Sequence, residues 1–308
     1  MKTANWKKEA KMAKRKNLPW LLKASLLLGL LFLYIPLIIL VVYSFNDSKL
    51  VTVWGGFSTK WYAKLMNNDQ ILEAALLSLR IAVASSLAAV ALGTLAGYAL
   101  ARIKRFWGST LFTGMVSAPM MMPDVVTGLS TMLLISQALS MMKGALGDSE
   151  WLQPGFFTIF LGHATLCMAY VTVVIRARLL ELDQSLEEAA MDLGARPLKI
   201  FFVITLPLIA PAIVSGFLLG ITLSLDDLVI TTFLSGPGST TLPQLIFAKI
   251  KLGLDPQMNV LATFIIAAVG TLVILLNWYM MRQVTRRERE AAEAERQERL
   301  AVEQAIHH

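Results

Sequence analysis

Apolar residues gather in six long runs along the chain, and charged residues lie almost entirely between them. The runs cover about 24–44, 75–100, 110–136, 155–175, 203–224 and 258–281. A helix needs roughly 20 apolar residues to cross a hydrocarbon layer of about 30 Å, so each run is long enough to span a bilayer. The pattern therefore predicts an all-α membrane protein with six transmembrane helices.

Composition supports the same class of protein. Of the 308 residues, 56% are hydrophobic and 16% are charged, which is more apolar surface than one soluble core of this length can bury. The net charge of +7 could indicate nucleic acid, but the basic residues form short clusters beside the apolar runs, as membrane topology requires. We therefore expect a lipid bilayer and no nucleic acid as partner. Cys167 is the single cysteine, which excludes an intrachain disulfide and a metal site built from cysteine pairs.

The basic residues also predict the orientation. The first run follows a basic leader, but it is too long for a signal peptide and lacks a cleavage site, so we expect it to remain as a helix. Lys and Arg number twenty-one in the two terminal segments and the loops after the second and fourth runs, against six in the opposite loops. The positive-inside rule places the first set, with both termini, in the cytoplasm. The expected parts are a basic cytoplasmic segment (1–23), a six-helix transmembrane domain (24–281) and a charged cytoplasmic tail (282–308).

The loop between the fourth and fifth runs contains EEAAMDLGARPLKIFFVITLP at 187–207. Ser185 and Glu188 have the spacing of a capping box, which predicts the start of a short helix. Gly194 is placed to end that helix, and Pro197 suits the first turn of a second one. We therefore expect two short helices with a bend between them.

One side of the first short helix carries small side chains. Leu186, Ala189, Ala190 and Leu193 follow the spacing of a helical stripe whose centre permits close approach by another surface. The loop is either an ordinary connector with good caps or a docking element for a cytoplasmic partner.

The residues EAAMDLG, followed by ITLP, resemble the cytoplasmic EAA loop of permease subunits in ABC importers that depend on a substrate-binding protein. The matching positions are Glu188, Ala189, Ala190, Gly194, Leu206 and Pro207. YSFNDSKLVTVWGGFSTKWY at 43–62, MMPDVVTGLS at 121–130 and SLDDLVITTFLSGPGSTTLP at 224–243 resemble the polyamine branch of that family. The similarity covers about 20–282 and implies the type I ABC importer permease fold, with the EAA loop (about 183–207) between helices 4 and 5.

The resemblance also implies partners and a location. Members of the family pair with a second, homologous permease in the bacterial inner membrane, and a periplasmic binding protein delivers the substrate, here a polyamine such as putrescine or spermidine. Two ATP-binding subunits receive the EAA helices. The chain has no phosphate loop of the form G-x-x-x-x-G-K-[ST], so ATP has to be bound by those separate subunits. We expect neither a cofactor nor enzymatic activity in this chain.

Three acidic residues near membrane depth are candidates for the substrate pathway. Asp124 follows Pro119 and Pro123, which should break the third run, and Asp226 and Asp227 end the fifth. A charge near the bilayer centre costs about 2.5–3.5 kcal/mol on insertion scales, so such acids usually face a cavity or a partner. Acids suit the route of a polycationic amine. Alternatively, these aspartates are solvated helix ends.

Four other residues have weaker signals. Trp54 in the first outer loop could attract an alkylammonium group to its ring, or belong to an interfacial aromatic belt. His163, alone in the fourth run, is expected to be a hydrogen-bonded core residue. Gly93 and Gly97 form a GxxxG pair that predicts tight helix packing.

Two other classes of protein share some of these features. A secondary transporter for a small organic cation would also have broken helices and intramembrane acids, but the chain shows no internal repeat and the EAA-like loop would stay unexplained. An intramembrane aspartyl protease could use Asp124 with Asp226 or Asp227, yet the surrounding residues do not resemble such enzymes.

Overall fold

The computed structural model describes residues 20–103, 107–146, 153–253, 255–271, 274–275, 278 and 281–282. Within these ranges the regular elements are helices, with one isolated β-bridge between Asn46 and Phe57. Five described helices are long and apolar enough to cross a membrane, and a shorter apolar helix covers Pro256–Thr271. This confirms the predicted all-α, multi-spanning class. Residues 1–19 and most of the tail 282–308 lie outside the described residues.

Two compact units make up the chain, and the first joins its two ends, Met1–Asn67 and Leu254–His308. It contains α2 (Trp20–Tyr43), α3 (Lys60–Met66) and the helix over Pro256–Thr271. The helix α2 begins at Trp20, earlier than the expected 24, and buries none of its residues. Asn46 organises the loop after it: its side chain accepts hydrogen bonds from the Ser48 and Gly55 N–H groups, and its carbonyl accepts one from the Trp61 indole.

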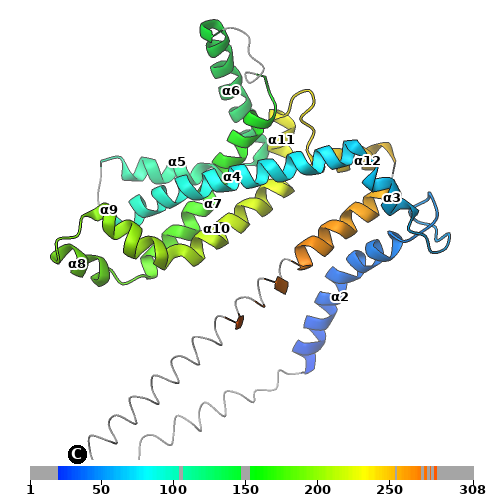
Figure 1. The fold of residues 1–308 in the computed structure, drawn as a ribbon, viewed down its shortest axis with the longest axis horizontal. Helices are drawn as coiled ribbons and strands as arrows, with labels where there is room; N and C mark the ends of the chain where they lie inside the picture. The colour runs from blue at the N-terminus through cyan, green and yellow to red at the C-terminus, as the bar shows by residue number, and fades with distance from the viewer. Residues whose placement is uncertain are drawn as a thin grey trace, which may run out of the picture. The chain divides into compact units, whose positions relative to one another are not determined.

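The second unit, Asn68–Gly253, is built around three long helices that lie side by side (Figure 1). They are α4 (Asp69–Arg102), α7 (Phe156–Glu181) and α10 (Leu206–Asp226). Gly93 and Gly97 of α4 lie directly against α7: a Cβ added at Gly93 would be 2.9 Å from Val171 Cγ1, and one at Gly97 would be 3.1 Å from Ile175 Cγ2. The predicted role of the GxxxG pair in close packing is confirmed, because a Cβ at either position would come unusually close to α7.

The third apolar run forms two helices, α5 (Ser109–Met121) and α6 (Asp124–Leu146). They are separated by Met122, which is extended at φ −86° and ψ 146°, and by Pro123. A residue before proline is disfavoured in the helical region, and proline has no N–H to continue the ladder. The expected break is confirmed, but the membrane-length segment is Asp124–Met142 and not 110–136.

Short helices occupy the two ends of this bundle (Figure 1). Between α7 and α10 lie α8 (Ser185–Asp192), α9 (Pro197–Ile200) and the π-helix η2 (Phe201–Thr205), which runs directly into α10. After α10 follow α11 (Val229–Leu234) and α12 (Leu242–Leu252). Since α10 has 21 residues, it separates the 183–207 loop from α11 by about 30 Å.

Candidate functional site

The 183–207 loop begins differently from the sequence prediction. The helix α8 starts at Ser185, and the side chain of Gln184, the residue before it, makes no capping hydrogen bond. The expected capping box of Ser185 and Glu188 is therefore wrong, because Ser185 already lies inside the helix. Its N–H instead donates to Asp183 Oδ1 at 2.9 Å, and this hydrogen bond lowers the pKa of the exposed Asp183 carboxyl.

The end of α8 agrees with the prediction. Gly194 is left-handed, at φ +83°. Its N–H donates to the Met191 carbonyl at 2.8 Å, and the Ala195 N–H donates to the Ala190 carbonyl at 3.0 Å. This pair of bonds is the Schellman motif, which satisfies the last carbonyls of a helix. Pro197 is the first residue of α9, as expected.

The outer side of the loop carries large apolar side chains that no other described residue covers. Leu193 is 89% exposed and Leu198 is 74% exposed, and Leu186 and Met191 are also exposed. Glu188 and Ala189 share this exposure, whereas Ala190 is half-buried. At the exit of the loop, Leu206 packs partly against the helical core and Pro207 is exposed. Such a concentration of exposed apolar groups is typical of an interaction surface.

The inner side of the loop holds a contact that the sequence did not reveal. Glu187 Oε2 lies 3.1 Å from Arg102 Nε, and Glu187 Oε1 accepts a hydrogen bond from Thr205 Oγ1 at 2.9 Å. Adjacent residues on a helix point about 100° apart, so Glu187 faces the bundle while Glu188 faces away. The two neighbouring glutamates gave no signal of this difference, because Arg102 is far away in the sequence.

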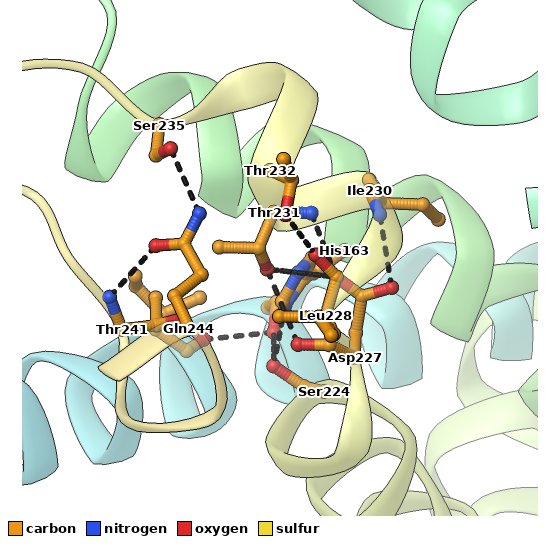
Figure 2. A network of polar contacts seen from close by, with 12 residues as sticks. His163, Ser224, Asp227, Leu228, Ile230, Thr231, Thr232, Ser235, Thr241 and Gln244 are labelled. Carbon is orange, nitrogen blue, oxygen red and sulfur yellow. Dashed lines mark hydrogen bonds and ion pairs between the residues drawn. The ribbon is translucent and has the colours of Figure 1, made fainter. Parts of the chain in front are cut away.

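At the opposite end of the bundle, His163 of α7 lies at the centre of a polar network (Figure 2). Its Nδ1 is 2.7 Å from Ser224 Oγ, and its Nε2 is 2.9 Å from Thr231 Oγ1 and 3.1 Å from Asp227 Oδ2. His163 is buried, and the prediction that it is a hydrogen-bonded core residue is confirmed. The network joins α7, the last turn of α10 and α11.

The serine, histidine and aspartate of this network are the residue types of a hydrolase triad. Ser224 is buried, however, and its oxygen also lies 3.4 Å from Ser85 Oγ. An imidazole with its hydrogen on Nε2 satisfies both hydrogen bonds of His163, because Ser224 then donates to His163 and His163 donates to Asp227. These hydrogen bonds hold α7, α10 and α11 together, and we call the group of His163, Ser224, Asp227 and Thr231 the polar lock. The polar lock contains no exposed nucleophile. Among the described residues, no three His, Cys, Asp or Glu side chains gather as metal ligands.

The three predicted pathway acids have different surroundings. Asp227 is enclosed: besides His163, it accepts hydrogen bonds from the Ile230 and Thr231 N–H groups at the start of α11. Asp226, its neighbour, is exposed, and so is Asp124, the first residue of α6.

The first turns of α6 bring Asp124 to the same end of the bundle. A Cβ at Gly128, one turn after Asp124, would lie 3.3 Å from Ile230 Cα of α11. The structure thus places Asp124 at the start of the helix that packs against α11, and Asp226 and Asp227 directly before α11 in the chain. Trp54 belongs to the other unit, where its half-exposed ring packs edge-on against Tyr43 with centroids 5.9 Å apart.

Several membrane helices, with an exposed loop before the fifth of them, are the architecture expected of an importer permease. Residues 89–289 match the family described as "Binding-protein-dependent transport system inner membrane component", and the chain belongs to this family. The predicted family is therefore confirmed.

Its relatives include named transport proteins. The chain is 56% identical over 263 residues to the putrescine transport system permease protein PotI of Escherichia coli (strain K12), covering 85% of this chain and 91% of that protein. It is 41% identical over 243 residues to the spermidine/putrescine transport system permease protein PotC of the same organism, covering 79% and 87%.

The fold also matches solved structures. A chain of the bacterial alginate ABC transporter in complex with an alginate pentasaccharide-bound periplasmic protein has a TM-score of 0.66 and 20% identity, covering 89% of this chain and 97% of that one. A structure of a bacterial ABC transporter involved in alginate import gives a TM-score of 0.64 at 18% identity, covering 85% and 95%. The predicted type I ABC importer permease fold is thereby confirmed.

Proposed function

We propose that this chain is a permease subunit of an ATP-driven importer that moves polyamines, putrescine or spermidine, from the periplasm to the cytoplasm. Its family is one of binding-protein-dependent inner-membrane components, which supports an importer over a secondary transporter for an organic cation. The substrate class is supported by 56% and 41% identity to permeases named for putrescine and for spermidine/putrescine. A second homologous permease and a periplasmic polyamine-binding protein complete the transporter.

The observation that carries the coupling role is the exposed apolar surface of α8 and α9. Leu193 and Leu198 are largely exposed, and burying one leucine side chain is favourable by about 1.5–3 kcal/mol. We infer that this surface is the cytoplasmic EAA loop and docks on one of two separate ATP-binding subunits, while the second permease docks on the other. ATP binds to those subunits and not to this chain, and both termini lie on their side of the membrane.

Each residue of the EAA pattern has a role in this docking. The exposed Glu188 faces the partner, and Ala189 and Ala190 permit close approach by another surface. Gly194 sets the bend between α8 and α9. Leu206 and Pro207 fix the exit of the loop into α10.

The acids around α11 are proposed to meet the substrate at the other, periplasmic end. Asp124 and Asp226 are exposed and offer negative charge to an ammonium group, while Asp227 adds charge behind them. Trp54 offers a separate aromatic contact for an alkylammonium group in its own unit, an interaction of about 0.5–2 kcal/mol. The attraction has to be modest, because a site that held the amine tightly would not release it.

Uptake of radiolabelled putrescine tests both parts of this function. Vesicles that contain the complete transporter should accumulate putrescine only with ATP inside and the loaded binding protein outside. Asp226→Asn and Asp124→Asn should lower uptake at an equal amount of complex, since each removes an exposed charge and keeps the shape. Uptake driven by a proton gradient without ATP would instead establish a secondary transporter. Unchanged uptake in both variants would place the cation route elsewhere.

A further inference from the structure

One enclosed carboxylate links the 183–207 loop to two membrane helices. Glu187 lies in the first turn of α8, Arg102 is the last residue of α4, and Thr205 ends η2 directly before α10. Glu187 contacts both of them, with Oε2 3.1 Å from Arg102 Nε and Oε1 2.9 Å from Thr205 Oγ1. Three elements, one of them distant in sequence from the other two, therefore meet at a single side chain.

The contact is shielded from water. The Glu187 side chain is 13% exposed and that of Arg102 is 7% exposed, whereas the nearby Arg178–Glu181 pair of α7 is 41% and 68% exposed. Exposed ion pairs constrain their neighbours weakly, because water and salt screen them and both side chains move. An enclosed pair fixes geometry, because neither charge can move away without losing its partner. The two pairs thus provide a matched comparison.

Little else holds α8 to the bundle. None of its residues is buried, and the side chains around Glu187 point into solvent or are half-buried. The guanidinium of Arg102 depends on Glu187 in turn: its Nη1 and Nη2 atoms are buried and have no acceptor among the described residues. Removing the Glu187 charge therefore leaves a buried cation without a described counter-charge and weakens the link between α8 and α4.

We propose that Glu187 is the positioning residue through which movement of α8 reaches α4 and α10. This proposal rests on the coupling role proposed above. The outward face of α8, with Glu188 and the exposed apolar side chains, contacts the ATP-binding subunit. The inward face passes displacement to the ends of two membrane helices through Glu187. One helix turn then has two separate tasks on different faces.

The test uses the complete transporter with its ATP-binding subunits and binding protein, measuring putrescine moved per ATP hydrolysed. Glu187→Gln preserves the shape and removes the charge. The complex should still assemble and hydrolyse ATP, while transport per ATP falls about tenfold or more, because the buried Arg102 guanidinium then has no counter-charge. Thr205→Val removes one hydrogen bond and leaves no charge unpaired, and it should give a smaller loss. Glu181→Gln, which breaks only the exposed pair, should behave as the unmodified complex.

Exchange of the two charges separates positioning from a general structural defect. The double variant Glu187→Arg with Arg102→Glu should recover much of the transport per ATP that each single reversal loses. Unchanged transport per ATP in both Glu187→Gln and Thr205→Val would overturn the proposal, as would failure of Glu187→Gln to bind the ATP-binding subunits. The unmodified complex is measured first: absence of ATP-dependent uptake there would refute the importer function itself, irrespective of Glu187.

Discussion

Replacement of Gly194 by valine tests the bend between α8 and α9. Gly194 has φ +83°, a left-handed conformation that costs an L-residue about 1–2 kcal/mol, and a β-branched side chain tolerates it worst. A Cβ at this position would meet no heavy atom within 4 Å. The substitution therefore causes no collision with the rest of the molecule, and its whole cost lies in the backbone of the turn.

The size of the effect follows from this local cost. A change of 1–2 kcal/mol corresponds to a factor of about 5–30 in the population of the correct turn. When the turn opens, the hydrogen bond from Ala195 to Ala190 is lost, and Leu198 moves relative to Leu193. We expect ATP hydrolysis coupled to transport to fall by about the same factor. Membrane insertion should be unaffected, because α8 buries no residue.

The measurement is binding-protein-stimulated ATP hydrolysis in lipid nanodiscs, with uptake measured in parallel. Gly194→Asn should behave nearly as the unmodified protein, since asparagine tolerates the left-handed region. Gly108→Val provides a matched control: Gly108 has φ +85° and a Cβ there would also meet no heavy atom within 4 Å, but this glycine lies before α5. It should cost the same backbone strain without loss of coupling.

Two outcomes would refute the reasoning. Normal transport and ATP hydrolysis by Gly194→Val would show that the bend does not determine docking. Equal losses in Gly194→Asn and Gly194→Val would show that side-chain volume at the contact surface matters, and that the backbone conformation does not.

Two further predictions concern the helical bundle. His163→Ala should lower the thermal unfolding midpoint in detergent, because it leaves Ser224 and Asp227 without their buried partner at a cost of about 1–3 kcal/mol. Thr165→Ala, on the exposed side of α7, should leave the midpoint unchanged. Equal midpoints in the two variants would contradict the polar lock. Gly93→Ala should destabilise the protein by about 1–3 kcal/mol, since its Cβ would lie 2.9 Å from Val171 Cγ1. Gly114→Ala is the control, because a Cβ there meets no heavy atom within 4 Å. Equal unfolding midpoints of the two variants would show that α4 and α7 can move apart to admit the methyl group.

The sequence predicted those parts of the fold that depend on local chemistry. A run of about 20 apolar residues is a strong signal for a membrane helix, and Pro123 and Gly194 each impose a backbone conformation at their own position. The capping box failed for a related reason. Its spacing was present, but the helix began one residue too early for the Ser185 side chain to serve as cap.

The sequence could not distinguish neighbouring residues of the same type. Glu187 and Glu188 are equivalent in a linear pattern, and so are Asp226 and Asp227. In the fold, one member of each pair is enclosed by partners from distant segments, Arg102 for Glu187 and His163 for Asp227, while the other is exposed. These partners are set by the packing of α4, α7 and α10, which one sequence does not encode in any local signal.

The exposure of α2 has a consequence for biogenesis. A 24-residue apolar helix is about 36 Å long and satisfies its own backbone hydrogen bonds, so lipid alone is an adequate solvent for it. Because it buries no residue, it can settle in the bilayer while the ribosome is still producing the rest of the chain. A substitution that prevents α4, α7 and α10 from packing would therefore leave a polypeptide that is still anchored. Membrane-bound proteases, and not soluble ones, would be the first to meet it.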